Sequence, residues 1–290
     1  MARVTIPEFA IRPDVVIVAG AGALPAQLAL SARASGAHVG IVTVAGTTDG
    51  DYSAFDSVSV RFGEVGRLRT LLRAAKADVV LSGQFKRPDY AAVAWDWGIV
   101  PILARVLRTG FGGDDAALRI ISSIMDDWGV RMVGPSDIAP DLVAATGQIA
   151  GGKPNNQDRA DIKCGFDVIS ATAPFDVGQC VVVHQGRVLA VEAAEGTDAM
   201  LERCADLRRS GRLRSRGRAG VLIKRAKPGQ DLRSDMPVIG LETIRRAEAA
   251  ELRGIAVEAG RVLIADKAEV MSYVQRTGLF LVGVDNTTET

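Results

Sequence analysis

The sequence is poor in the residues that most often bind transition metals. Its 290 residues include only two histidines and three cysteines. His38 begins an apolar run and His184 ends one, so we expect both to be structural. The cysteines form no CxxC pair, whereas a structural zinc site needs about four clustered ligands. This scarcity excludes a histidine-rich two-metal phosphoesterase site and disfavours structural zinc.

Long apolar runs and an excess of charge of either sign are also absent. The apolar stretches have the length of strands, well below the roughly 20 residues that a membrane-spanning helix needs. The first residues show no signal peptide, so we expect a cytoplasmic protein that is dissolved or visits a membrane surface. The 35 basic residues nearly balance the 34 acidic ones, and we therefore expect no nucleic-acid partner.

The first half of the chain alternates apolar strands with helices. Strand-like runs and helical periodicity follow one another at residues 15–19, 25–35, 38–44, 64–75 and 78–82. Such alternation is typical of a parallel sheet covered by helices. We therefore predict a Rossmann-like α/β domain over residues 1–147.

The composition changes after this half. Glycine, proline and asparagine dominate residues 147–158, and we interpret 148–164 as a linker. Short strands are then expected at residues 180–184, 187–191, 220–224, 261–265 and 279–284. The pair Gln185-Gly186 is typical of a tight hairpin turn. Because no second copy of the first half is present, we predict a distinct α+β domain over residues 165–290.

Two loops follow strands of the first domain. Residues 19–25 (AGAGALP) carry glycines that let a phosphate approach a helix N-terminus, but Pro25 stands where the third glycine of GxGxxG would be. A plain turn fits this loop as well as a phosphate cradle. Residues 83–88 (GQFKRP) carry amides and two cations, which suit either an anion site or a solvated loop.

Two segments of the second domain concentrate charge. Residues 192–198 (EAAEGTD) place three carboxylates together, which indicates a metal-binding cluster or a helix cap. Residues 224–240 (KRAKPGQDLRSDMPVIG) mix cations with carboxylates, a combination suited to a diphosphate with magnesium. We expect the carboxylates of both segments to converge on one site. A third segment, 207–218, holds six arginines and is either a solvated loop or a contact for an anionic membrane.

Several longer segments resemble one family, in the same order and at similar spacing from about Val15 to Asp285. They are GAGALPAQLA, GQFKRPDY, GDDAALR, DVGQCVVVHQGRVLAVEAAEGTDAML, KPGQDLRSDMPVIGLETI and GLFLVGVD. The chain is similar to the LpxI family of UDP-2,3-diacylglucosamine pyrophosphatases. The resemblance implies magnesium-dependent hydrolysis of that substrate to UMP and 2,3-diacylglucosamine 1-phosphate (lipid X), in lipid A biosynthesis. It also implies a homodimer and transient contact with the inner membrane.

The resemblance and the charged segments together define the expected site. The family's important aspartate in its DxPxIG segment matches Asp235, which we expect to be catalytic or to bind metal. We expect Mg²⁺, or another divalent cation such as Mn²⁺, on Glu195, Asp198, Asp231 and Asp235. The residues expected to bind substrate are Gly22, Ala23, Leu24, Gly83, Gln84, Lys86, Gln179, Thr197, Lys224, Lys227 and Gln230.

Two other functions remain open on the sequence. The strand–glycine–helix start also suits an NAD(P)-dependent oxidoreductase, although no acidic residue stands near Val44 at the end of the second strand. A non-catalytic protein that binds nucleotide or lipid phosphate would use the same cations and leave the diphosphate intact.

Overall fold

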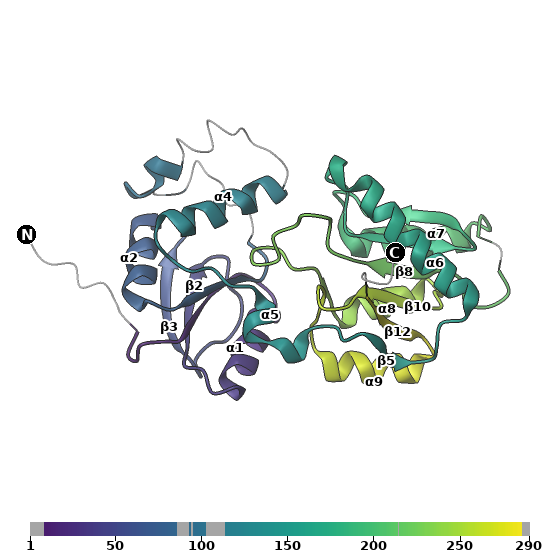
Figure 1. Cartoon of the computed structure of the whole chain (residues 1–290), viewed down its shortest axis with the longest axis horizontal. Helices are drawn as coiled ribbons and strands as arrows, with labels where there is room; N and C mark the ends of the chain where they lie inside the picture. Colours follow the sequence, from purple (N-terminus) through teal and green to yellow (C-terminus); the bar gives the residue numbers. More distant parts are fainter. Residues whose placement is uncertain (1–8, 86–92, 94, 103–113, 214, 286–290) are drawn as a thin grey trace, which may run out of the picture. The chain divides into compact units, whose positions relative to one another are not determined.

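A computed structural model gives the fold of the chain (Figure 1). The structure describes residues 9–85, 93, 95–102, 114–213 and 215–285. It divides the chain into two compact units, which are residues 1–141 with 233–235, and residues 142–232 with 236–290. Each unit has its own sheet and its own helices. The predicted fold class, a parallel-sheet α/β unit followed by a different unit of strands and helices, is confirmed.

Unit 1 is built on a parallel sheet of four strands in the order β3-β2-β1-β4. The strands are β1 (Val15–Ala19), β2 (Val39–Ala45), β3 (Asp56–Arg61) and β4 (Asp78–Ser82). All five residues of β1 are buried, as expected of a central strand covered on both faces. β1 and β4 are hydrogen-bonded neighbours, so the loops that follow them leave the same edge of the sheet.

Helices cover both faces of this sheet. Unit 1 contains α1 (Leu24–Ala34), α2 (Val65–Ala75), α4 (Asp114–Asp127) and the short α5 (Pro135–Ile138). Leu72 of α2 and Met125 of α4 join Val16 and Val18 of β1 in one apolar cluster. The buried side of α1, which includes Leu28, packs on β1 and β2. The apolar side of α4, which includes Met125, thus faces the sheet.

Unit 2 is built on a mixed sheet of six strands in the order β5-β12-β10-β8-β6-β7. The strands are β5 (Gly147–Gly151), β6 (Cys180–His184), β7 (Arg187–Val191), β8 (Val221–Lys224), β10 (Gly254–Glu258) and β12 (Phe280–Val284). β8, β10 and β12 are parallel, while β5 and β6 run against them at the two sides. β6 and β7 form the hairpin predicted from Gln185-Gly186, and both turn residues have positive φ, of 52° and 73°.

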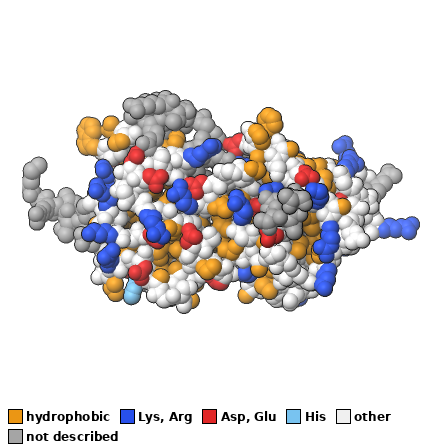
Figure 2. Space-filling model, in the orientation of Figure 1, with side chains coloured by type: hydrophobic (Ala, Val, Ile, Leu, Met, Phe, Trp, Pro, Cys, Tyr) orange, Lys and Arg blue, Asp and Glu red, His pale blue; other side chains and the backbone are white. Residues whose placement is uncertain are grey.

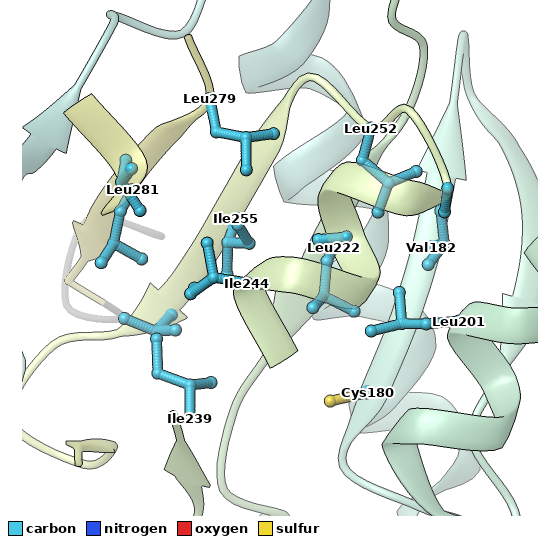
Figure 3. Close-up of a cluster of buried hydrophobic side chains, with 14 of the residues drawn as sticks. Cys180, Val182, Leu201, Leu222, Ile239, Ile244, Leu252, Ile255, Leu279 and Leu281 are labelled. Carbon is cyan, nitrogen blue, oxygen red and sulfur yellow. The ribbon is translucent and has the colours of Figure 1, made fainter. Parts of the chain in front are cut away.

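Two apolar layers hold the helices of unit 2 to its sheet. On one face α7 (Gly196–Arg209), α8 (Leu241–Ala249) and α9 (Lys267–Thr277) supply side chains such as Leu201 and Ile244, which pack on Leu222, Ile255 and Leu281 (Figure 3). On the other face α6 (Asn156–Thr172) packs on Val221 and Ile223 of β8. A two-stranded parallel sheet, β9 (Val238–Ile239) with β11 (Leu263–Ile264), completes the unit. Successive residues of β8 therefore point to opposite layers.

Residues 148–164, which we expected to be a linker, are part of unit 2. β5 pairs antiparallel with β12, and α6 begins at Asn156. The glycine, proline and asparagine content has a local cause, because Gly147 and Gly151 have positive φ and Asn155 caps α6. Asp158 accepts from Asn155 N at 2.9 Å, which completes a capping box. The composition marks a strand end and a helix start instead of a linker.

No helix in the described part of the chain is long and apolar enough to cross a membrane. Basic and acidic side chains lie interspersed on the face shown in Figure 2, as the near-zero net charge leads one to expect.

Candidate functional site

The loops after β1 and β4 cross at one edge of the unit 1 sheet. Ala21 and Gln84 exchange backbone hydrogen bonds of 2.8 and 2.9 Å. The crossing depends on two glycines. A Cβ on Gly20 would lie 2.7 Å from the carbonyl oxygen of Gln84, and one on Gly83 would lie 2.7 Å from that of Ala21. Gly83 also has φ of 90°, so this position favours glycine for two independent reasons.

Gly22, Ala23 and Leu24 lead from this crossing into α1. The N–H of Gly22 donates to the carboxylate of Asp49 at 2.8 Å, so this N–H already has an acceptor within the protein. Ala23 is the N-cap of α1 and no side chain caps the helix. In the described part of the predicted phosphate cradle, the backbone N–H groups at the N-terminus of α1 are therefore the donors that a phosphate could use. Lys86 lies outside the described residues.

Lys224 is a buried cation at the carboxyl end of β8. Its exposed fraction is 9%, and it follows Ile223 in the strand, so its side chain points to the α7 face. The ammonium donates to the hydroxyl oxygen of Thr197 at 3.2 Å. Among the residues that the structure describes, no carboxylate forms an ion pair with it. Burying an ammonium with one hydrogen bond is costly, so this position is suited to a bound anion.

Thr197 stands in the first turn of α7 and connects Lys224 to Glu192. Its hydroxyl donates to one carboxylate oxygen of Glu192 at 2.7 Å. The second oxygen accepts from the backbone N–H of Gln179 at 2.8 Å. Of the expected binding residues, the structure thus brings Gln179, Thr197 and Lys224 together, with Glu192 between them. The alternative that residues 192–198 serve as a helix cap is wrong for their side chains, because Glu195 is the N-cap of α7 and no side chain makes a capping hydrogen bond there.

Cys180 lies beside this network and is completely inaccessible to solvent. Its thiol is 3.6 Å from the hydroxyl of Thr197. Burial raises the pKa of Cys180 to about 12, and the nearby Lys224 ammonium only partly offsets this effect. The thiol therefore stays protonated at neutral pH and serves as apolar filling.

Arg225 and Glu258 form a buried ion pair on the other face of β8. Their closest side-chain atoms are 3.5 Å apart. The guanidinium also donates to Ser170 at 3.0 Å and lies over the ring of Phe166, with its central carbon 4.9 Å from the ring centroid. Glu258 accepts from the backbone N–H of Ala226 at 3.1 Å. The pair therefore anchors the start of the loop that follows β8.

Lys227 and Gln230 occupy that same loop. The Lys227 ammonium is 2.7 Å from the carboxylate of Asp176 and has an exposed fraction of 7%. Its backbone N–H donates to the side-chain oxygen of Gln230 at 2.8 Å. Lys227 thus differs from Lys224 in having a carboxylate partner within the protein. Gly229, with φ of 77°, closes the turn.

The expected metal-binding carboxylates at the start of α7 are paired with arginines. Glu195 forms an ion pair with Arg203, and Asp198 lies 3.6 Å from Arg246. In the part of the chain that the structure describes, no three His, Cys, Asp or Glu side chains come close enough to hold a metal ion. The metal ligand set therefore stays a prediction.

Asp231 and Asp235 are assigned to different units of the chain. Asp231 belongs to unit 2, whereas Asp235 lies in the three-residue segment assigned to unit 1. The catalytic role of Asp235 stays a prediction.

The arginines of 207–218 do not share one role. Arg208 donates to the carbonyl of Glu251 at 3.3 Å, and Arg218 donates to that of Thr277 at 2.9 Å. These two side chains hold the segment to unit 2. Arg212 and Arg216 are exposed, and Arg214 lies outside the described residues.

Three carboxylates of the polar network around β8 are absent from the set predicted to bind substrate or metal: Glu192, Asp176 and Glu258. Glu192 had a local signal, because it directly follows the predicted hairpin and belongs to the 192–198 carboxylate cluster. Asp176 and Glu258 had none, because they lie 51 and 32 residues from their partners Lys227 and Ala226. Only the sheet and α6 bring them into place.

The fold and these contacts define a two-domain α/β protein with a buried cation at the carboxyl end of a sheet strand. Two family models match it, the LpxI N-terminal domain over residues 14–142 and the LpxI C-terminal domain over residues 145–282. The chain belongs to the LpxI family. It is 38% identical over 270 residues to UDP-2,3-diacylglucosamine pyrophosphatase LpxI from Caulobacter vibrioides. The aligned residues cover 93% of this chain and 96% of that protein.

Proposed function

We propose that this protein hydrolyses the diphosphate of UDP-2,3-diacylglucosamine and releases UMP and 2,3-diacylglucosamine 1-phosphate, a step of lipid A biosynthesis. The proposal follows the activity named for the Caulobacter relative, to which the chain is similar over nearly its whole length. Its structural support is Lys224, a buried ammonium that has one neutral hydrogen-bond partner in the described structure. A diphosphate supplies the anionic oxygens that this position lacks.

The reaction needs charge neutralisation and a positioned water. Water attacks one phosphorus, the bond from that phosphorus to the bridging oxygen breaks, and the bridging oxygen stays with the other phosphate. Lys224 neutralises phosphate oxygens as negative charge develops on them. Asp235 orients the attacking water and accepts its proton. The remaining expected binding residues hold the nucleotide and sugar parts of the substrate.

Magnesium is part of the proposal and suits the available side chains. It prefers oxygen ligands and keeps several waters, so one or two carboxylates are sufficient. The carboxylates proposed to hold the ion are Glu195, Asp198, Asp231 and Asp235, of which Glu195 and Asp198 also form ion pairs with Arg203 and Arg246. When bound, magnesium neutralises charge on the phosphates.

The substrate carries two acyl chains, and we propose that the protein meets it at the surface of the inner membrane. We also propose that the protein is a homodimer.

The exposed arginines of residues 207–218 are the proposed contact with that membrane. Each basic residue near an anionic surface contributes about 1 kcal/mol of attraction. Arg208 and Arg218 are used within unit 2, so the docking variant changes only Arg209, Arg212 and Arg216 to Gln. Weaker co-sedimentation of this variant with anionic liposomes at low salt is expected. Equal sedimentation would remove these arginines from membrane docking.

The proposed function is tested by incubating the purified chain with UDP-2,3-diacylglucosamine and magnesium in detergent. Release of UMP and lipid X in equal amounts is expected. Binding of the substrate without any release over hours would instead identify a non-catalytic binding protein.

A further inference from the structure

We infer that Glu192 is a positioning residue that fixes the direction of the Thr197 hydroxyl and, through it, the position of the Lys224 ammonium. This inference rests on the proposed function, in which Lys224 contacts the diphosphate. In the described part of the chain Glu192 forms no hydrogen bond or ion pair with Lys224, and its two carboxylate oxygens accept from Thr197 and from the backbone N–H of Gln179. It acts on Lys224 through Thr197.

The direction of the hydrogen bonds carries the inference. A threonine hydroxyl has one proton, and a carboxylate can only accept. The contact of 2.7 Å between Thr197 and Glu192 therefore takes that proton. The hydroxyl oxygen then turns its lone pairs away from Glu192, and an ammonium, which can only donate, reaches it from Lys224 at 3.2 Å.

Both oxygens of Glu192 are required by this arrangement. One accepts from Thr197 and the other from the backbone N–H of Gln179. A glutamine at this position has a single acceptor oxygen, so one of the two donors faces an amide NH₂ group. Gly178 lies against the Glu192 side chain, where even a Cβ on Gly178 would come within 2.4 Å of the Glu192 Cγ. The side chain therefore has little room to find another arrangement.

The position of Lys224 depends on this arrangement because Thr197 is its hydrogen-bond partner. In the described structure no carboxylate pairs with Lys224 to hold it in place. When the Thr197 proton points toward Lys224, the ammonium loses its acceptor and moves. Glu192 thus sets where the cation meets a phosphate oxygen.

The test is a double-mutant cycle on Glu192→Gln and Thr197→Val, read as kcat and KM for UMP release. Each single variant is expected to lower kcat/KM by about 10- to 100-fold, because one buried hydrogen bond to a charged group is lost. In the Thr197→Val background, Glu192→Gln is expected to add less than about 3-fold, because the hydroxyl that it orients is gone. Effects that multiply, or a Glu192→Gln variant with wild-type kcat/KM, would overturn the inference.

Two controls separate positioning from folding. Thr197→Ser keeps the hydroxyl and is expected to stay within about 3-fold of wild type, whereas Thr197→Val is not. If Thr197→Val is as active as wild type, the inference is overturned even when Glu192→Gln fails to fold. Glu202→Gln makes the same change at an exposed position of α7 and should leave kcat/KM unchanged.

Failure of the proposed function gives a different result from failure of this inference. If the wild-type chain releases no UMP, the proposed function is wrong, and the cycle is repeated on its affinity for inorganic pyrophosphate, measured by calorimetry. The same non-additive pattern in Kd is expected, because Lys224 binds phosphate oxygens with or without a reaction. Additive losses of affinity, or none, would contradict the positioning role.

Discussion

The carboxylate of Glu258 lies 3.5 Å from the guanidinium of Arg225, and both side chains are more than 90% buried. Glu258 ends the central strand β10, and Arg225 follows the neighbouring strand β8. Arg261, 3.4 Å from the same carboxylate, brings a second and more exposed cation to it. Glu258 also accepts from the backbone N–H of Ala226 at 3.1 Å, and the pair thereby connects the core of unit 2 to the loop that carries Lys227.

Glu258→Ala is expected to destabilise the protein strongly. The change leaves Arg225 buried without a counter-charge and leaves the N–H of Ala226 without its acceptor. Breaking a buried pair from one side costs about 3–5 kcal/mol in the free energy of unfolding. Urea denaturation followed by circular dichroism measures the loss. The exposed Glu269→Ala is the matched control and should change stability by less than about 0.5 kcal/mol. A cost below about 1 kcal/mol for Glu258→Ala would show that water or a rearrangement compensates Arg225.

Asp235→Ala is expected to fold normally and bind substrate but to lose nearly all hydrolysis. Removing a group that orients water or holds metal raises the barrier by about 3–5 kcal/mol. The measurement is kcat for UMP release, with substrate affinity determined separately. Asp206→Ala, an exposed aspartate paired with Arg209, is the control and should keep wild-type kcat. Near-normal turnover by Asp235→Ala would remove this residue from the mechanism.

Divalent metal is expected to be required for activity. The acidic side chains available are oxygen ligands of the kind that magnesium uses with substrate phosphates. Exhaustive EDTA treatment followed by dialysis should abolish UMP release, and added Mg²⁺ or Mn²⁺ should restore it. Full activity of the chelated enzyme would contradict the metal requirement.

The three cysteines are expected to differ sharply in reactivity. Burial raises the pKa of Cys180 to about 12 and that of Cys204 to about 11, while Cys164 is only half-buried. Because the thiolate is the reactive form, Cys164 should react with iodoacetamide at pH 8 at least about 10-fold faster than the other two. Peptide mass spectrometry measures each rate, with the urea-unfolded protein as the reference in which all three react alike. Equal rates in the folded protein would contradict the buried placement of Cys180.

The sequence predicted the strands whose apolar pattern is strongest. The limits of β1, β4, β6 and β7 agree with the expected ranges because β-branched runs end there at turn residues. It missed β10, whose residues GIAVE include a glycine, an alanine and a buried glutamate. Those residues form a strand because β8 and β12 pair with them on both sides. Tertiary pairing, which no local pattern encodes, decides such a segment.

Site prediction had the same limit. Thr197 and Lys224 were named from the charged segments, and the structure joins them because α7 packs over β8. The carboxylate partners of Lys227 and Arg225 were not predictable, because Asp176 and Glu258 are distant from them in sequence. Which cation keeps an open position for a ligand follows only from those partners. That distinction selects Lys224 over Lys227.

The most direct test of the account is the rate of UMP release from UDP-2,3-diacylglucosamine by wild type and by Lys224→Met, which keeps the length of the side chain without its charge. Wild type is expected to convert the substrate in the presence of magnesium, whereas Lys224→Met is expected to fold yet lose at least about 100-fold in kcat/KM. Folding of the variant is checked by its unfolding midpoint. A Lys224→Met enzyme with wild-type kcat/KM would contradict the central claim that this buried ammonium serves the diphosphate.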